Sequence, residues 1–199
     1  MKNQIKYSAD GKSAPKLLAI LGSPHNNGTT AVMLDCAIEA AHKAGWQVDV
    51  VRLYEKNIGY CKGCRACLRT QLCVYSDDIQ EIARLMKECD RVVLAAPVYW
   101  GNVPAIVKNM FDRLLGAAME ETKTFPAPRL KGKEYMLLTA CNTSAPFSYI
   151  FGQSRGIIHV VKEFFKTAGM KRRGVYVCAG TGAGHKPSRA LLRRIASRW

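Results

Sequence analysis

The sequence lacks an apolar run long enough to cross a bilayer. The first apolar run after the N-terminal lysines is only Leu17–Leu21, and Gly22 and Pro24 end it. A membrane-spanning helix needs about 20 apolar residues, and the core of a signal peptide needs about 7 or more. We therefore expect a soluble, cytoplasmic protein that makes no membrane contact.

Acidic residues are also scarce. The chain has 15 Asp and Glu against 30 Lys and Arg, which gives a net charge of +15. A basic surface of this kind attracts an acidic redox partner, a phosphorylated cofactor or nucleic acid. A solvated surface without any partner explains the charge equally well. Nucleic-acid binding by a zinc-containing module is the least supported interpretation, because no nucleic-acid motif and no interleaving of aromatic and basic residues is present.

Two common phosphate-binding motifs are missing. The sequence has no G-x-x-x-x-G-K-[ST], which binds nucleoside triphosphates, and no G-x-G-x-x-G, which binds dinucleotides. A phosphate site in this chain must therefore be of another kind, such as one for a monophosphate.

The length and composition indicate one domain. With 199 residues, 48% of them hydrophobic, the chain can bury a core without disulfides or metal ions. Residues 1–15 are polar and have no apolar periodicity, so we predict a flexible arm there. No internal repeat or linker divides residues 16–199, which we expect to form a single domain.

Five apolar segments of strand length alternate with amphipathic segments of helical length. The expected strands are Lys16–Leu21, Gln47–Leu53, Arg91–Ala96, Lys133–Ala140 and Gly174–Ala179. The expected helices are Thr29–Ala44, Asp77–Cys89, Pro104–Gly116, Ser154–Ala168 and Pro187–Arg198. This alternation predicts an α/β fold with one parallel sheet and helices on both of its faces. Ligands bind such folds beyond the carboxyl ends of the strands, which makes residues 22–30, 97–103 and 141–151 the candidate binding loops.

The first of these loops, Gly22–Thr30, joins a strand to a helix. The first N–H groups of a helix lack partners and lie at the positive end of its dipole, so they suit a phosphate. Ser23, Thr29 and Thr30 can add hydroxyl donors, and the absence of a lysine favours a terminal monophosphate over a triphosphate. A simple helix cap made by Asn27 or Thr29 is the alternative.

The second loop follows the most apolar strand and reads APVYWGNVP, residues 96–104. A planar ring system such as isoalloxazine needs a flat wall and close backbone N–H groups. Tyr99 or Trp100 can supply the wall, and Gly101 allows close approach of the backbone. Ordinary packing or a subunit interface would explain the two aromatic residues as well.

Together, the two loops resemble a known family. GSPHNNGTT after the first expected strand and APVYWGNVPAIVKNMFDRL after the third are similar to the NAD(P)H-dependent FMN reductase family of the flavodoxin-like superfamily. The resemblance implies a flavodoxin-like, doubly wound, five-stranded parallel sheet of strand order 2-1-3-4-5. It also implies a homodimer or homotetramer with the flavin site near the subunit interface.

The resemblance further implies FMN as the cofactor and NAD(P)H as the electron donor. The FMN phosphate maps onto Ser23, His25, Asn27, Thr29 and Thr30, and His25 stands where the family usually has arginine. The isoalloxazine ring maps onto Pro97, Val98, Tyr99, Trp100, Gly101 and Asn102. From the third loop, the expected neighbours of the ring are Asn142, Thr143 and Ser144.

Four of the eight cysteines lie close together, at Cys61, Cys64, Cys67 and Cys73. The spacing C-x2-C-x2-C-x5-C can surround a four-iron four-sulfur cluster, and it makes the chain resemble the iron–sulfur flavoprotein branch of the family. A structural zinc ion, redox-active thiols activated by neighbouring basic residues, and a loop without metal are the alternatives. The other four cysteines lie in apolar contexts that indicate inert thiols.

Two functions follow from these patterns. In the first, the protein is an FMN-dependent oxidoreductase that accepts hydride from NAD(P)H and reduces a small acceptor. In the second, FMN and a four-iron cluster make an electron carrier for acidic, ferredoxin-like partners. Because flavins carry the chemistry themselves, we predict no catalytic side-chain acid or base.

Overall fold

The computed structural model describes residues 14–199. The predicted flexible arm, residues 1–15, lies outside the described residues except at its last two positions. Among the described residues, no helix combines the length and the apolar character that crossing a membrane requires.

The centre of the molecule is a five-stranded parallel sheet. Its strands are β1 (Lys16–Leu21), β2 (Gln47–Arg52), β3 (Arg91–Pro97), β6 (Glu134–Cys141) and β7 (Lys171–Ala179). They lie in the order β2-β1-β3-β6-β7, and every neighbouring pair is parallel. Counted along the five expected strands, this order is 2-1-3-4-5. The predicted α/β class and the flavodoxin-like strand order are therefore confirmed.

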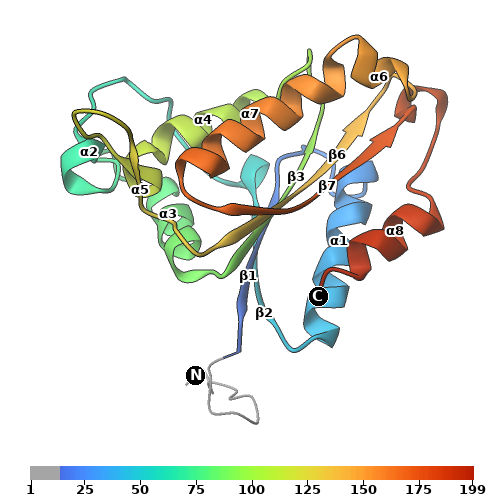
Figure 1. Cartoon of the computed structure of the whole chain (residues 1–199), viewed down its shortest axis with the longest axis horizontal. Coiled ribbons are helices and arrows are strands. Elements are labelled where there is room, and N and C mark those ends of the chain that lie inside the picture. The colour runs from blue at the N-terminus through green and yellow to red at the C-terminus, as the bar shows by residue number, and fades with distance from the viewer. Residues whose placement is uncertain (1–13) are drawn as a thin grey trace.

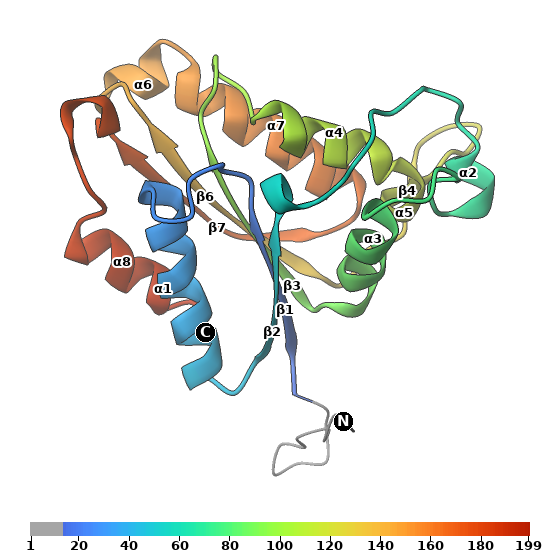
Figure 2. The same ribbon diagram turned by 180° about the vertical axis from the view of Figure 1, so that it is seen from behind.

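Helices cover both faces of the sheet, as the sequence predicts (Figure 1, and from behind in Figure 2). On one face lie α1 (Thr29–Lys43) and α8 (Arg189–Ala196). On the other lie α3 (Ile79–Glu88), α4 (Ala105–Arg113) and α7 (Gln153–Thr167). This arrangement leaves the three central strands with helices on both sides, which explains why their sequences are almost continuously apolar.

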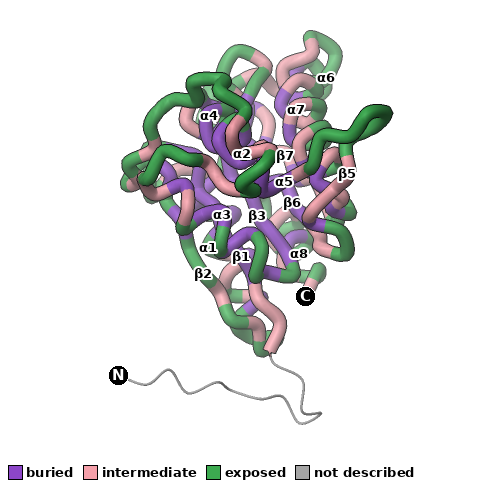
Figure 3. The backbone as a smooth tube through the Cα atoms, turned by 90° about the vertical axis from the view of Figure 1, so that its left-hand side faces the viewer, coloured by how far each residue is buried: buried purple, intermediate pink, exposed green. Residues whose placement is uncertain are grey.

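Alternation along β1 divides the core in two. Leu18 and Ile20 pack into the cluster under α3, α4 and α7, whereas Leu17, Ala19 and Leu21 pack into the cluster under α1 and α8. Successive side chains of a strand point to opposite faces, so one apolar strand serves both clusters. Figure 3 shows the buried centre of the molecule; strands β1, β3 and β6 are almost entirely buried, whereas the edge strands β2 and β7 are more exposed.

Several short elements were not predicted. They are α2 (Cys67–Thr70), α5 (Leu115–Ala118), α6 (Phe147–Ile150), the short helical turns Leu53–Glu55 and Thr181–Ala183, and a hairpin of β4 (Met119–Glu120) with β5 (Ala127–Pro128). The predicted helix Pro104–Gly116 is in fact two helices, α4 and α5, divided at Leu114. Segments of two to four residues are too short to show a period of 2 or 3.6, which is why sequence patterns did not reveal them.

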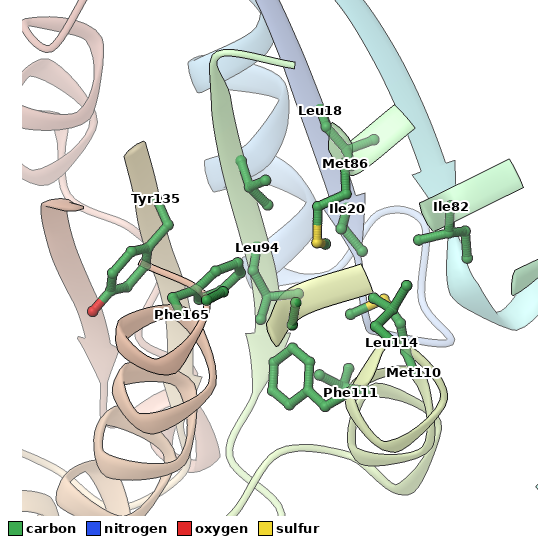
Figure 4. Close-up of a cluster of buried hydrophobic side chains, with 14 of the residues drawn as sticks. Leu18, Ile20, Ile82, Met86, Leu94, Met110, Phe111, Leu114, Tyr135 and Phe165 are labelled. Atoms are coloured by element: carbon green, nitrogen blue, oxygen red, sulfur yellow. The ribbon is translucent and has the colours of Figure 1, made fainter. Parts of the chain in front are cut away.

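Three aromatic side chains pack together in the larger of the two core clusters. Phe165 is fully buried, and its ring stacks on Tyr135 of β6 with 4.5 Å between centroids. The edge of the same ring faces Phe111 of α4, at 6.0 Å between centroids. Figure 4 shows these side chains between the sheet and the helices. Phe165 thus joins α7 both to the sheet and to α4.

Replacing this ring tests how much the core depends on it. We expect Phe165→Ala to lower the free energy of unfolding by about 3–5 kcal/mol, because the substitution removes a buried ring and leaves a cavity. Urea denaturation followed by circular dichroism measures the loss. Phe125→Ala is the matched control, since the Phe125 side chain is 81% exposed and its removal should change little. Equal losses in the two variants would contradict this description of the core.

Candidate functional site

Three loops meet at the carboxyl edge of the sheet. Because β1, β3 and β6 are parallel neighbours, the loops that follow them leave from the same edge. The N–H of Gly22 donates to the carbonyl of Ala95 at 2.8 Å, which joins the first loop to β3. The N–H of Val98 donates to the carbonyl of Ala140 at 2.8 Å, which joins the second loop to β6.

A groove of about 460 Å³ lies between the second and third loops. It is lined by Val98, Trp100, Gly101, Cys141, Asn142, Thr143, Phe151, Gly152 and Gln153. A volume of this size suits a small organic ligand, for which pockets of about 300–1,000 Å³ are usual. Five predicted ring neighbours line the groove together: Val98, Trp100, Gly101, Asn142 and Thr143.

The second loop forms a tight turn at its tip. The N–H and carbonyl groups of Tyr99 and Asn102 exchange two hydrogen bonds of 2.9 Å. Trp100 and Gly101 between them both have positive φ angles, 52° and 72°. A tryptophan in this conformation is strained. The Trp100 indole is fully exposed and borders the groove.

Four predicted ring neighbours do not line the groove. Pro97 ends β3, and Tyr99 forms the base of the tight turn. The Asn102 side-chain oxygen accepts the N–H of Val103 at 2.8 Å, a bond within the loop itself. Ser144 is part of the third loop, and its hydroxyl lies beside Gly180. These four residues support the loops that line the groove.

The first loop keeps the features of a phosphate site. Helix α1 begins at Thr29, after Gly28, and no side chain caps it. The alternative of a simple cap by Asn27 or Thr29 is therefore not observed. Among the described residues, no hydrogen-bond acceptor faces the N–H groups of Thr29, Thr30 and Ala31.

The side chains of the first loop differ in how deeply they are buried. The buried Ser23 hydroxyl accepts the N–H of His25 at 3.2 Å, which shapes the turn before the helix. Thr30 is also buried, whereas the side chains of His25 and Asn27 are exposed. The hydroxyl-bearing residues thus lie closest to the protein body, and His25 lies at the rim.

A loop that sequence reasoning did not single out supports the third binding loop. The N–H groups of Gly180 and Gly182 donate to the carbonyls of Thr143 and Asn142, at 3.0 and 3.3 Å. The Thr181 hydroxyl donates to the Asn142 side-chain oxygen at 3.0 Å. The alternating glycines in GTGAG, residues 180–184, were the available signal, because they permit the positive φ angles that occur at Gly180 and Gly184.

Helix α7 contributes a further residue that was missed, Gly156. A Cβ atom at this position would lie 1.8 Å from the carbonyl oxygen of Gly101. The helix therefore touches the tip of the second loop backbone to backbone, and only glycine permits this contact. Gly152 and Gln153, at the start of the same helix, line the groove. This contact therefore fixes the position of the second loop relative to the groove.

The four clustered cysteines line a second, smaller cavity of about 40 Å³. Cys61 and Cys64 are exposed, and Cys67 and Cys73 are half-buried. Asp112 and Arg113 of α4 and Leu115 of α5 also line this cavity. The four cysteines predicted as metal ligands thus border one cavity, and their binding of a cluster stays a prediction.

The cysteines are not arranged around a single ion. No group of three or more His, Cys, Asp or Glu side chains in residues 14–199 lies close enough to hold one metal ion. Tetrahedral zinc needs sulfur atoms about 3.8 Å apart, given Zn–S bonds of about 2.3 Å. In a four-iron cluster each cysteine binds a different iron, so the sulfur atoms stand further apart. All four cysteines line the same cavity, and four thiols are the donor set that a four-iron cluster requires.

The environment of Cys67 does not support activated thiols. Burial raises the pKa of the Cys67 thiol, and the neighbouring Cys73, Cys61 and Cys64 raise it further. Activation would require a lowered pKa. Among the scattered cysteines, burial raises the pKa of Cys89 to about 12, as expected for an inert thiol.

Comparison with known proteins identifies the family. The sequence profile described as NADPH-dependent FMN reductase matches residues 15–161. The chain belongs to this family. An iron–sulfur flavoprotein of Archaeoglobus fulgidus is 42% identical over 118 residues, which are 59% of this chain and 50% of that protein. An iron–sulfur flavoprotein of Methanosarcina thermophila is 38% identical over 98 residues, 49% of this chain and 51% of that protein. The chain spans about half the length of these curated relatives.

Solved structures show that the fold extends beyond the matched segment. The NAD(P)H:quinone oxidoreductase of Methanothermobacter marburgensis superposes with a TM-score of 0.73 at 15% identity, covering 94% of this chain and 95% of that one. Smu.1420 of Streptococcus mutans gives a TM-score of 0.73 at 20% identity, covering 92% and 97%. The family resemblance and the flavodoxin-like fold expected from the sequence are both confirmed.

The contact between Gly156 and Gly101 yields a prediction for this FMN reductase family member. In Gly156→Ala the added methyl group must displace the loop tip, and overpacking of this kind costs about 1–3 kcal/mol. Because the displaced loop tip lines the groove, we expect FMN affinity to fall about tenfold, which corresponds to a loss of about 1.4 kcal/mol in binding free energy. Fluorescence titration of the apoprotein with FMN measures the affinity. His159→Ala, at an exposed position of the same helix, should bind FMN normally, and normal binding by Gly156→Ala would contradict the role assigned to this glycine.

Proposed function

We propose that the chain is a cytoplasmic, FMN-dependent oxidoreductase that accepts hydride from NAD(P)H and reduces a small acceptor. The observation that carries this proposal is that the uncapped start of α1 and a groove of about 460 Å³ lie at the same edge of the sheet. The first feature suits a phosphate, and the second suits a ring system. FMN contains both groups, joined by a short chain.

The residues of the first loop would hold the FMN phosphate. The N–H groups of Thr29, Thr30 and Ala31 lie at the positive end of the α1 dipole, where a phosphate is favoured. The hydroxyls of Ser23, Thr29 and Thr30 are within the same short loop. The exposed His25 lies at the rim of the loop, so we expect most of the affinity to come from the backbone N–H groups and the hydroxyls.

The residues of the groove would hold the ring. Val98 offers an apolar surface, and Gly101 lets the backbone approach the ring closely. Asn142 and Thr143 of the third loop offer polar groups. Trp100 stands at the mouth, where the nicotinamide would approach. The flavin supplies the redox chemistry when it is bound, and the chain supplies binding and orientation without a catalytic acid or base.

Exposed aromatic side chains beside the groove favour a homo-oligomer. Phe147, Tyr149 and Phe151 of the third loop region are 52%, 59% and 70% exposed, and Trp100 is fully exposed. Apolar side chains gathered in this way mark interaction surfaces. We infer a homodimer or homotetramer in which a second subunit covers this edge of the flavin site.

Flavin binding and reduction test the proposed activity. The apoprotein should bind FMN more tightly than riboflavin, and NADH or NADPH should then remove the yellow flavin absorption under anaerobic conditions. In the double variant with Thr29→Val and Thr30→Val we expect FMN affinity to fall about tenfold or more, because hydrogen bonds to a charged group contribute about 1.5–3 kcal/mol. Riboflavin affinity should not change, since riboflavin has no phosphate.

Thr167→Val, at the end of α7, is the matched control. It makes the same chemical change outside the loop and should leave both affinities unchanged. A protein that binds no FMN would contradict the proposed activity itself. Equal losses of FMN and riboflavin affinity in the double variant would show instead that the phosphate lies elsewhere.

A second proposed function adds a four-iron four-sulfur cluster at Cys61, Cys64, Cys67 and Cys73, which would make the protein an electron carrier. Two observations support it. All four cysteines border one cavity, and the matched relatives named above are called iron–sulfur flavoproteins. Exposed basic residues in the same loop, Lys62, Arg65 and Arg69, suit an acidic, ferredoxin-like partner.

Iron analysis after anaerobic purification tests this second function. We expect about four irons and four acid-labile sulfides per chain, with a broad brown absorption beneath the flavin bands. Cys64→Ser should lower the iron content and leave FMN binding intact, because Cys64 does not line the flavin groove. Cys178→Ser, a buried cysteine in β7, should retain full iron content. Protein without iron after reconstitution would contradict the cluster and leave the flavin oxidoreductase.

A further inference from the structure

Arg113, the last residue of α4, is buried beside the cysteine cavity. Its side chain is only 1% exposed, although the cysteine loop around it is largely exposed. An arginine buried to this extent requires partners for its charge and for all of its N–H groups. The structure supplies both.

Every N–H donor of this guanidinium is used. Nε donates to the Cys73 Sγ at 3.1 Å. One terminal nitrogen donates to the Asp77 Oδ2 at 2.8 Å and to the carbonyl of Gly59. The other donates to the Asp77 Oδ1 and to the carbonyl of Tyr75, both at 3.0 Å. Arginine has five N–H groups in a fixed planar fork, and here they contact both ends of the cysteine loop.

The partners of Arg113 are themselves held in place. The Asp77 carboxylate also accepts the N–H groups of Gly59 and Ile79, each at 3.0 Å. Burial alone would raise the pKa of Asp77, but the hydrogen bonds from Arg113 and these N–H groups outweigh it and lower the pKa. Asp77 is therefore ionised at neutral pH, and it neutralises the guanidinium.

Asn109, one turn earlier on α4, reinforces the same contact. Its side-chain nitrogen donates to the carbonyls of Ile58 and Gly59 at 3.2 Å, and its oxygen accepts the N–H of Cys61 at 3.3 Å. Residues four apart lie on one face of a helix. That face of α4 therefore fixes the first and the last cysteine of the loop.

Cys73 differs from the other three cysteines in its partner. In the described part of the chain, it is the one member of the cluster set whose sulfur accepts a hydrogen bond from a charged side chain. Hydrogen bonds to cluster sulfurs and nearby charge are the main means by which a protein sets the potential of an iron–sulfur centre. Reduction adds negative charge, which an N–H donor stabilises.

We propose that Arg113 is a positioning residue for the iron–sulfur centre, which fixes the Cys73 sulfur and raises the reduction potential of the cluster. This inference rests on the proposed cluster function. Because Asp77 neutralises the charge of the guanidinium, the hydrogen bond from Nε to the Cys73 sulfur affects the reduction potential more than the net charge of Arg113 does. Lysine cannot reproduce this contact, since its single ammonium lacks the planar fork that reaches Cys73, Asp77 and two carbonyls together.

The test compares Arg113→Gln and Arg113→Lys with the wild-type protein after anaerobic cluster reconstitution. We expect both variants to have a lower midpoint potential in a spectroscopic redox titration, and the glutamine variant to have the lower of the two. We also expect an iron chelator to remove iron from both variants at least about tenfold faster than from the wild-type protein. The loss of a residue that supports a metal ligand generally weakens metal binding by about tenfold or more.

Arg91→Gln is the matched control. Arg91 is the other deeply buried arginine paired with a carboxylate, through two bonds to Glu134 at 3.0 and 2.7 Å. It lies at the start of β3, at the opposite end of that strand from the binding loops. This variant should lose stability but keep the wild-type potential and the wild-type rate of iron loss.

The outcomes separate the two proposals. Wild-type protein that forms no cluster overturns the cluster function and this inference with it. A wild-type cluster whose potential and iron loss are unchanged in both Arg113 variants overturns only this inference. An equal change in Arg91→Gln would also overturn it, because the effect would then come from general loosening of the fold. If Arg113→Gln does not fold, Arg113→Lys keeps a cation opposite Asp77 and carries the comparison.

Discussion

The parallel pairing of β3 with β1 on one side and with β6 on the other is the constraint on which the functional regions depend. The register places Leu21 of β1 beside Ala95 of β3, and Pro97 of β3 beside Ala140 of β6. The three strands therefore end at nearly the same level along the sheet, and the loops that follow them start from the same edge. The first loop and the groove between the second and third loops therefore lie at one edge of the sheet because of backbone hydrogen bonding alone.

Glycines convert this common edge into defined loop positions. Gly156 lets α7 approach the carbonyl of Gly101 directly, and Gly116 lets α5 approach the backbone of Cys67, where a Cβ would lie 2.1 Å from the carbonyl oxygen. One contact adjoins the groove and the other adjoins the cysteine cavity. In both places a helix contacts a loop through main-chain atoms, which fixes the position of the loop.

The sequence predicts the regular part of this structure well. The five strands were predicted to within about three residues at each end, because each is a continuous or alternating apolar segment whose burial the sheet requires. The cysteine loop and the groove residues Val98, Trp100, Gly101, Asn142 and Thr143 were also predicted, through motif and resemblance. The missed features depend on contacts between distant segments. The segment Gly180–Gly184 is important only because its backbone hydrogen-bonds to Asn142 and Thr143. The sequence shows Arg113 only as a residue of a predicted helix, because its five hydrogen-bond acceptors lie on other segments of the chain.

Helix α4 links the two functional regions. It begins immediately after the second binding loop, with Pro104 before its first turn, and it ends at Arg113 in the cysteine cavity. Nine helical residues rise about 13 Å, and Val107 and Met110 are fully buried along this length. A rigid, well-packed helix therefore sets the spacing between the groove and the cysteines. The second binding loop and the cysteine cavity lie at opposite ends of one helix, so the fold fixes their relative position.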